Sequence, residues 1–249
     1  MISNVLKQKF LEQETVDLER KKIISPYRFK IKYNFMPKPE TREVFEKAVK
    51  KWTGIIQHSV DSPIGEDIEL DVYLKERDPR VMASAGILMT RNRRPVESVI
   101  YLNSLNWDEQ LNQPQQDESE AYYTVVHEIG HAIGIGSCSL WTKQTQKYED
   151  GFYFLGENAL REYRTIFNNP NLVGVPLEDN GSENTAGSHI EEHDDRMVNG
   201  VSHPGMDHEL MSGWAEHHTV HEPISNVTLG MLEDIGYTVD YSKGEVFVI

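Results

Sequence analysis

Hydrophobic and polar residues alternate along two segments in the first third of the chain. Every second residue from Phe29 is apolar in segment 28–35, and segment 68–74 repeats the pattern from Ile68. Alternation of this kind predicts strands with one buried side. Two more short apolar segments, 86–90 and 98–102, predict further strands on either side of the basic turn RNRRP.

Apolar residues recur at spacings of three and four in several other segments, which is typical of helices with one buried face. The helices predicted in this way are 40–57, a segment from about Ser119, 156–167 and 225–235. Ser225 or Asn226 can cap the last of them, and Gly236 can end it. The polar segment 106–118 is expected to be a loop.

Strands and helices that alternate before residue 105 predict an α+β fold with a twisted mixed β-sheet covered by helices. Segment 134–223 is rich in Gly, Asn, His and Asp, with only the helix at 156–167 clearly periodic. We therefore expect a regular N-terminal lobe at about 26–136 and an irregular C-terminal lobe at about 137–249, closed by a helix.

The two lobes would form a single domain, 26–249. Residues 1–25 are expected to be a helical extension, because residues 1–24 have the mixed charged and apolar pattern of an amphipathic helix.

Composition excludes several classes of function. The chain has 249 residues, with 25 Lys+Arg against 40 Asp+Glu and a formal charge of −15, which argues against nucleic acid as a partner. No apolar run approaches the length of a membrane span, and Cys138 is the only cysteine. No signal peptide is visible, so we expect a chain that is intracellular, exported by a signal-independent route, or given without its leader.

The helix that begins near Ser119 contains VVHEIGHAIGIGS. His127 and His131 fall one turn apart on one face of it, so their ring nitrogens can bind one metal ion. Glu128 lies about 100° round the helix from His127, beside the ion rather than on it. A carboxylate there can take a proton from metal-bound water and pass it to a leaving amine, which is the chemistry of zinc peptidases.

The spacing of residues on this helix identifies two metal ligands but not the third. Gly134 can adopt a positive φ that ends the helix and turns the chain. In the metzincin pattern a third histidine follows three residues after such a glycine, but Ser137 stands there, and a hydroxyl is a poor zinc ligand. Either the third ligand comes from further along the chain, where the candidates are His189, His193, His203 and His208, or the site is not catalytic.

Several segments together resemble the leishmanolysin-like metallopeptidases, a branch of the metzincins. They are HEIGHAIGIG, GSENTAGSHIEE, ELMSGW and PISNVTLGMLEDIGYTVDY, and the run FKIKYNF…FEKAVKKWTGII extends the resemblance to about residue 27. The resemblance implies a metzincin-like fold and a zinc-dependent endopeptidase. It also implies that His127, His131 and His189 hold Zn²⁺, that Glu128 is the general base and then acid, and that Met211 is an apolar floor beneath the ligands.

The residues leave alternatives open for both the third ligand and the function. His203 or His208 can compete for the third position, and a glutamate of the 156–167 helix, Glu157 or Glu162, can supply it in the gluzincin manner. The chain can also be a metal-binding structural or surface module without turnover, although the intact Glu128 favours an enzyme. A latent precursor, with residues 1–24 blocking the cleft, is a third possibility.

Other polar residues are expected to have no catalytic part. We predict solvated imidazoles at His193, His203, His217, His218 and His221. The acidic stretch of Glu191, Glu192, Asp194 and Asp195 is expected to be solvated, with a calcium site as the alternative. Cys138 is predicted to be a small buried hydrophobe rather than a ligand or a latency thiol. The resemblance to metzincins also implies that a peptide or protein substrate lies in extended form along the strand near 85–90. The oligomeric state cannot be read from this sequence.

Overall fold

The computed structural model of the chain describes residues 28–59, 67–179, 185–193, 195–214 and 220–249. The helix predicted at 1–24 lies outside the described residues. In the part of the chain that is described, none of the helices is long and apolar enough to cross a membrane.

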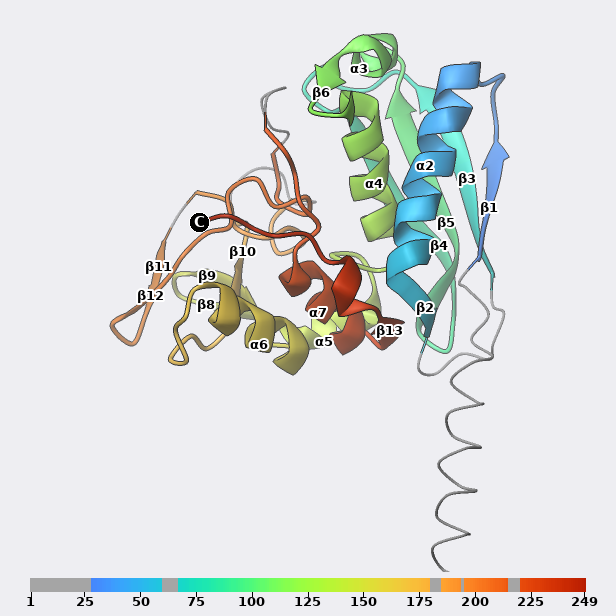
Figure 1. Ribbon diagram of the computed structural model, residues 1–249. Helices are drawn as coiled ribbons and strands as arrows, with labels where there is room; N and C mark the ends of the chain where they lie inside the picture. The colour runs from blue at the N-terminus through green and yellow to red at the C-terminus, as the bar shows by residue number, and fades with distance from the viewer. Residues whose placement is uncertain (1–27, 60–66, 180–184, 194, 215–219) are drawn as a thin grey trace, which may run out of the picture.

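A four-stranded mixed sheet forms the regular part of the molecule (Figure 1). Its strands, in spatial order, are β1 (Arg28–Tyr33), β3 (Asp67–Lys75), β5 (Arg94–Asn103) and β4 (Ala83–Arg91). The first three are parallel, and β4 runs antiparallel to β5 at the edge. All four predicted strands are confirmed. Asn92 and Arg93 make the β4–β5 turn with φ of 51° and 67°, so the strands extend into the predicted RNRRP turn.

Two helices cover one face of this sheet, α2 (Pro39–Ile55) and α4 (Glu120–Ala132) (Figure 1). Their apolar faces are buried in one core, where Trp52 of α2 donates a hydrogen bond from Nε1 to the carbonyl of Val126 at 2.9 Å. The helix predicted at 40–57 ends at Ile55, because the chain continues as β2 (Ile56–Ser59). This strand pairs with β13 (Tyr237–Val239) near the C-terminus.

The loop predicted at 106–118 was wrong in detail. The segment contains α3 (Trp107–Asn112) and a two-residue ladder between β6 (Pro114–Gln115) and β7 (Glu118–Ser119). Trp107 is buried and donates from Nε1 to Thr41 Oγ1 at 3.1 Å. Buried Trp107 and partly buried Leu111 anchor this short helix, and two apolar residues in a polar sequence are too few to show a period.

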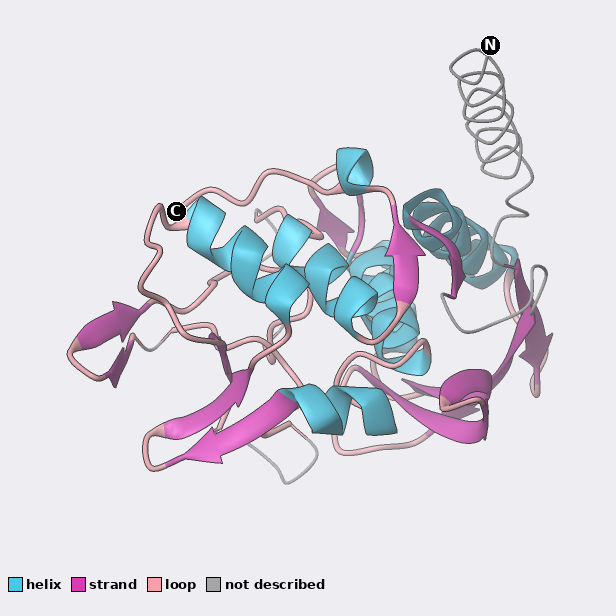
Figure 2. Cartoon of the chain, turned by 90° about the horizontal axis from the view of Figure 1, so that it is seen from below, coloured by secondary structure: helices cyan, strands magenta, loops and turns pink. Residues whose placement is uncertain are grey.

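The second part of the molecule is built from short elements that do not extend the four-stranded sheet (Figure 2). Its helices are α5 (Ser139–Gln144), α6 (Glu157–Ile166) and α7 (Asn226–Asp234), followed by the 3₁₀ turn η1 (Tyr241–Lys243); its strands are β8 (Thr145–Tyr148), β9 (Gly151–Phe154), β10 (Val175–Leu177), β11 (Arg196–Val198) and β12 (Val201–His203). The helices predicted at 156–167 and 225–235 are confirmed as α6 and α7. The short strands were missed, since three or four residues carry no readable alternation.

Helices α6 and α7 pack directly on one another. The carboxylate of Asp234, at the end of α7, accepts hydrogen bonds from the backbone N–H groups of Asn158 and Ala159 in the first turn of α6, at 3.0 and 2.9 Å. Gly236 follows with a φ of 95°, which lets the chain leave α7 as predicted. The molecule is therefore a mixed α+β structure, with α4 between the regular sheet and the part made of short elements.

Candidate metal centre

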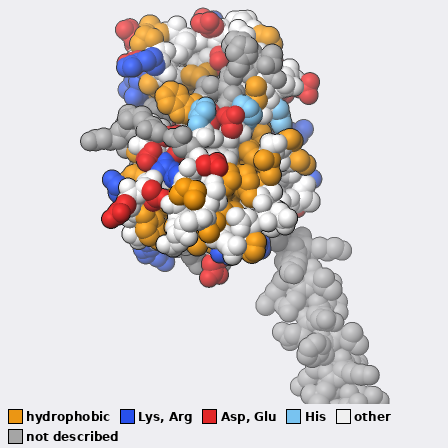
Figure 3. Space-filling view, turned by 90° about the vertical axis from the view of Figure 1, so that its left-hand side faces the viewer, with side chains coloured by type: hydrophobic (Ala, Val, Ile, Leu, Met, Phe, Trp, Pro, Cys, Tyr) orange, Lys and Arg blue, Asp and Glu red, His pale blue; other side chains and the backbone are white. Residues whose placement is uncertain are grey.

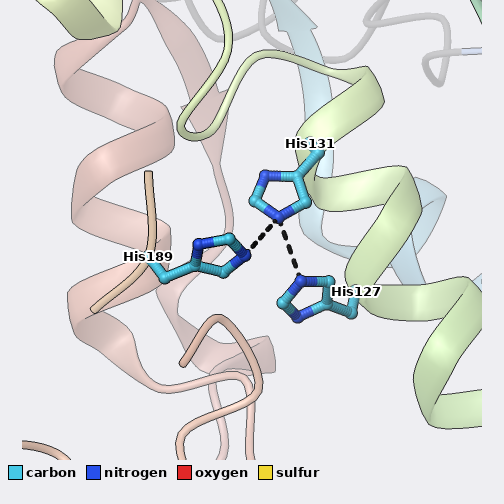
Figure 4. A group of neighbouring side chains, drawn as sticks. All are labelled: His127, His131 and His189. Carbon is cyan, nitrogen blue, oxygen red and sulfur yellow. Dashed lines mark hydrogen bonds between the residues drawn. The ribbon is translucent and has the colours of Figure 1, made fainter. Parts of the chain in front are cut away.

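Three histidines from two segments converge at one point (Figure 4). His127 and His131 project from neighbouring turns of α4, and His189 comes from a segment 58 residues beyond His131. The Nε2 atom of His131 lies 2.9 Å from Nε2 of His127 and 3.0 Å from Nε2 of His189. The predicted helix thus presents its two histidines on one face, and His189 reaches the same point.

The other ring nitrogen of each histidine faces a backbone carbonyl. Nδ1 lies 2.7 Å from the oxygen of Leu210 for His127 and 2.9 Å from that of Ile135 for His131. For His189 the partner is the Thr185 oxygen, at 3.1 Å. A carbonyl only accepts hydrogen bonds, so each Nδ1 carries the proton and each Nε2 of a neutral ring keeps its lone pair.

Burial favours the neutral form of all three rings. It lowers the pKa of His127 to about 3 and the pKa of His131 well below its usual value, and the neighbouring imidazoles lower both further. Burial lowers the pKa of His189 as well. Three lone pairs that face one another cannot hydrogen-bond among themselves, whereas a cation between them would be bound by all three.

The donor set fits zinc. Zn²⁺ binds neutral imidazole nitrogens at about 2.0–2.1 Å, and catalytic zinc sites use three protein ligands and leave a fourth position for water or substrate. Carbonyls that hold Nδ1–H groups are the usual outer partners of such ligands, because they fix both the tautomer and the orientation of the ring.

Glu128 follows His127 on α4 and is only 6% exposed. Its Oε2 atom has no hydrogen-bond partner among the described residues. Burial raises the pKa of this carboxyl group to about 8, against the opposing effect of the positive charge of Arg77. A buried carboxylate that uses none of its Oε2 capacity on the protein is suited to accept a proton from a small molecule.

The chain turns sharply after α4, as predicted from Gly134. This glycine has a φ of 124°, and a side chain in its place would also crowd the Cys138 thiol. The turn brings the Ile135 carbonyl back to His131. Ser137 donates from Oγ to the His131 carbonyl at 2.6 Å, so the residue at the usual third-histidine position supports the end of the helix instead.

The segment that carries His189 is held against this turn. Gly136, with a φ of 69°, leaves room for the backbone of Ser188, and the Ser188 hydroxyl donates to the Gly136 carbonyl at 3.0 Å. Trp141 donates from Nε1 to the Gly187 carbonyl at 2.9 Å. These contacts place the segment next to α4, and none of them could be predicted from a periodic pattern of residues.

Met211 packs against α4 from a turn at residues 209–212, which is called the Met turn below. Its side chain is fully buried, and a Cβ atom added to Gly130 would lie 2.6 Å from Met211 Sδ. The backbone carbonyl of Met211 accepts a hydrogen bond from Ile190, the residue after His189, at 2.9 Å. The glycine of HEIGH therefore allows the close approach of Met211 to α4, which sequence reasoning missed.

The competing ligands lie elsewhere. His203 is fully buried, not solvated as predicted: its Nε2 accepts from the Val173 backbone at 2.9 Å, because β12 turns this ring into the second part of the molecule. His208 is 3.2 Å from Asp207 and lies outside the three-histidine group. Glu157 is exposed, and Glu162 accepts from Arg161 at 2.8 Å, so α6 supplies no ligand to this group.

The remaining histidines agree with the prediction where they are described. His193 is largely exposed and His221 is exposed, with its Nδ1 3.3 Å from the Tyr123 hydroxyl. His217 and His218 lie outside the described residues.

The acidic stretch is not solvated throughout, which corrects the prediction. Glu191 and Glu192 are buried, because the chain at Ile190 bridges to Leu177 and Ser212 and draws its neighbours inward. Glu191 forms a buried ion pair with Arg196, which also binds Asp179 at 2.8 Å. Asp195 is exposed as predicted, and Asp194 lies outside the described residues.

Cys138 is a buried free thiol, as predicted. Its sulfur accepts from the Trp141 backbone at 3.4 Å and caps α5. Burial raises the pKa of the thiol. The side chain therefore serves in packing.

Histidine side chains reach the surface near the middle of the face seen in Figure 3, with hydrophobic side chains around them. Strand β4 is at the edge of the four-stranded sheet, and α4 packs against it. On this strand Leu88 and Met89 are about half exposed. The outer edge of β4 therefore pairs with no further strand among the described residues, and it carries exposed apolar side chains.

Comparison with known families gives one match. The family model described as leishmanolysin matches residues 65–249, which include α4, His189 and the Met turn. The resemblance of the segment from about residue 27 to 64 lies outside this match. No curated protein matches the chain. Because the family model covers more than half of its length, the chain belongs to the leishmanolysin family of metallopeptidases.

Proposed function

We propose that this chain is a zinc-dependent endopeptidase with a metzincin-like fold, in which His127, His131 and His189 hold the metal. The observation that supports this most strongly is the convergence of three Nε2 lone pairs, each fixed by a carbonyl on the far side of its ring. Members of this family are zinc metallopeptidases in general. Zinc supplies an activated water and polarises the substrate carbonyl when it is bound.

Glu128 is the general base and then the general acid of this proposal. It follows His127 directly on α4 and is not one of the three grouped histidines, so it would act on the metal-bound water rather than hold the metal. The buried carboxylate would accept the proton of the attacking water and later deliver it to the leaving amine nitrogen. Its raised pKa, about 8 without metal, favours holding that proton between the two steps, and a bound cation would lower this pKa.

The substrate is a peptide in extended form. An edge strand can add one more strand through its backbone N–H and C=O groups, and β4 is such an edge beside α4. Leu88 and Met89 offer exposed apolar contacts to the side chains of that peptide.

The test is peptide cleavage by wild type and Glu128→Gln, with zinc content measured on the same samples. We expect zinc in both and a loss of kcat by about 10²–10⁴-fold in the variant, as for removal of a general acid–base group. Glu157→Gln, an exposed position on α6, is the control and should behave as wild type. Equal cleavage by Glu128→Gln and wild type would contradict the role of Glu128, and absence of zinc from wild type would contradict the proposal as a whole.

A further inference from the structure

The carboxylate of Glu209 is buried, and none of the groups that donate hydrogen bonds to it is charged. The residue is 1% exposed and begins the Met turn. Its Oε1 atom accepts from the backbone and hydroxyl of Ser225 at 2.9 and 2.8 Å, and from the Thr228 hydroxyl at 2.6 Å. Its Oε2 atom accepts from the Met211 backbone at 2.6 Å. All four donors are neutral groups.

These four bonds join two parts of the chain. Ser225 is the N-cap position of α7 and Thr228 is in its first turn, where backbone N–H groups favour a negative charge. Met211 N–H belongs to the Met turn. The carboxylate therefore ties the turn to the start of α7 through one pair of oxygen atoms.

The backbone of the turn held in this way contacts one of the three histidines and the residue next to another. The Leu210 carbonyl accepts from His127 Nδ1 at 2.7 Å, and the Met211 carbonyl accepts from Ile190, next to His189, at 2.9 Å. Both carbonyls lie within two residues of Glu209. A shift of this turn would move the orienting partner of His127 and the backbone beside His189 together.

We infer that Glu209 is a positioning residue of the metal centre, which fixes the Met turn to α7 so that His127 and His189 are held ready for the ion. This inference rests on the proposed function. It differs from simple packing because its effect is directed at ligand geometry. The loss of an outer partner of a metal ligand typically weakens metal binding about 10–100-fold.

The chain offers a matched control for this idea. Asp234 is also a carboxylate that accepts backbone N–H bonds at a helix start, at Asn158 and Ala159 of α6. Its hydrogen bonds do not reach the Met turn or the three histidines. Asp234→Asn should therefore lower stability as Glu209→Gln does, without changing the metal centre.

The experiment measures zinc affinity by competition with a chromophoric chelator, the visible spectrum after replacement by Co²⁺, and Tm of the metal-free chain. The three measurements are made on wild type, Glu209→Gln and Asp234→Asn. We expect both variants to have a lower Tm than wild type. Only Glu209→Gln should bind zinc about tenfold more weakly and show a shifted Co²⁺ band. Zinc affinity and a Co²⁺ spectrum equal to wild type in Glu209→Gln would overturn the inference.

A milder variant covers the case in which Glu209→Gln does not fold. Ser225→Ala with Thr228→Val removes two of the four bonds, and we expect zinc affinity to fall about threefold. An unchanged affinity there would also overturn the inference. A wild-type chain that binds no zinc would instead contradict the proposed function, so the two failures are distinguishable.

Discussion

The chain up to the end of α4 and the chain after Gly134 place their side chains by different means. In the first part, periodic apolar faces of α2, α4 and the sheet meet in a core, with Trp52 bonded to the backbone of α4. In the second part, glycines with positive φ and hydrogen bonds from side chains to the backbone hold the segment that carries His189. Gly136 and Ser188 are an example. The proposed ligands are drawn from both parts. The helical period therefore places His127 and His131 on one face of α4, whereas the position of His189 depends on polar contacts of its segment.

The core of the first part should respond most strongly to change. Trp52→Ala removes a fully buried ring and its bond to Val126, and we expect the free energy of unfolding to fall by about 3–5 kcal/mol in urea titrations of the metal-free chain. Trp214→Ala, at a half-exposed position of the second part, should change it by less than about 0.5 kcal/mol. Similar losses in both variants would contradict this division.

Acid should weaken the metal-free chain through the three histidines where the two parts meet. Their pKa values are lowered by burial, so below pH 6.5 the unfolded chain binds protons that the folded chain does not. The three rings therefore lower stability as pH drops from 6.5, while the raised pKa of Glu128 opposes them with one proton against three. For His127 the window extends to about pH 3, with a slope of about 1.4 kcal/mol per pH unit.

Chemical denaturation of the chelated protein at pH 7, 6 and 5 measures this slope. His127→Gln should reduce it, and His193→Gln, at a largely exposed position, should leave it unchanged. The same slope in His127→Gln and in wild type would show that the His127 ring is not held in the neutral form.

Two glycines in helices of the first part distinguish two effects of a Gly→Ala substitution on stability: a steric clash with the Met turn and a gain in helix propensity. Gly130→Ala places a Cβ atom 2.6 Å from Met211 Sδ, and we expect a loss of about 1–3 kcal/mol on unfolding in urea. Gly54→Ala, in α2, meets no atom within 4 Å and should stabilise the chain by up to about 1 kcal/mol. Equal changes in the free energy of unfolding at the two positions would mean that Met211 does not pack closely against Gly130 of α4.

Ser137→Ala should have the smallest effect. It removes the bond from Oγ to the His131 carbonyl, which is worth about 1 kcal/mol of stability. Zinc content, measured by atomic absorption after dialysis, should stay at the wild-type value. A loss of zinc would show instead that Ser137 supports binding at the position where many metzincins have a histidine.

The sequence predicted the parts of the fold that carry a period. Four strands and the helices α2, α4, α6 and α7 follow from spacing, because each buries one regular face. Short strands such as β10 and the buried helix α3 carry too few residues for a period. His203 was misread for a related reason: a lone imidazole in a polar stretch gives no sign that β12 buries it.

The candidate site divides in the same way. His127, Glu128 and His131 follow from helical spacing, and Gly134 from the need for a turn. His189 was predicted as the third ligand from the family resemblance, and the structure brings its Nε2 atom close to those of His127 and His131. The contacts of Glu209 could not be read from sequence, because its partners at Ser225 and Thr228 follow 16 and 19 residues later.

The most direct test of the account is zinc content per chain in wild type, His189→Ala and His193→Ala, prepared and dialysed together. The account predicts about one zinc per chain in wild type and in His193→Ala, and little or none in His189→Ala, because a site of three imidazoles loses a ligand. His193 is the matched control, four residues away on the same segment and largely exposed. Full zinc in His189→Ala would contradict the claim that these three histidines hold the metal.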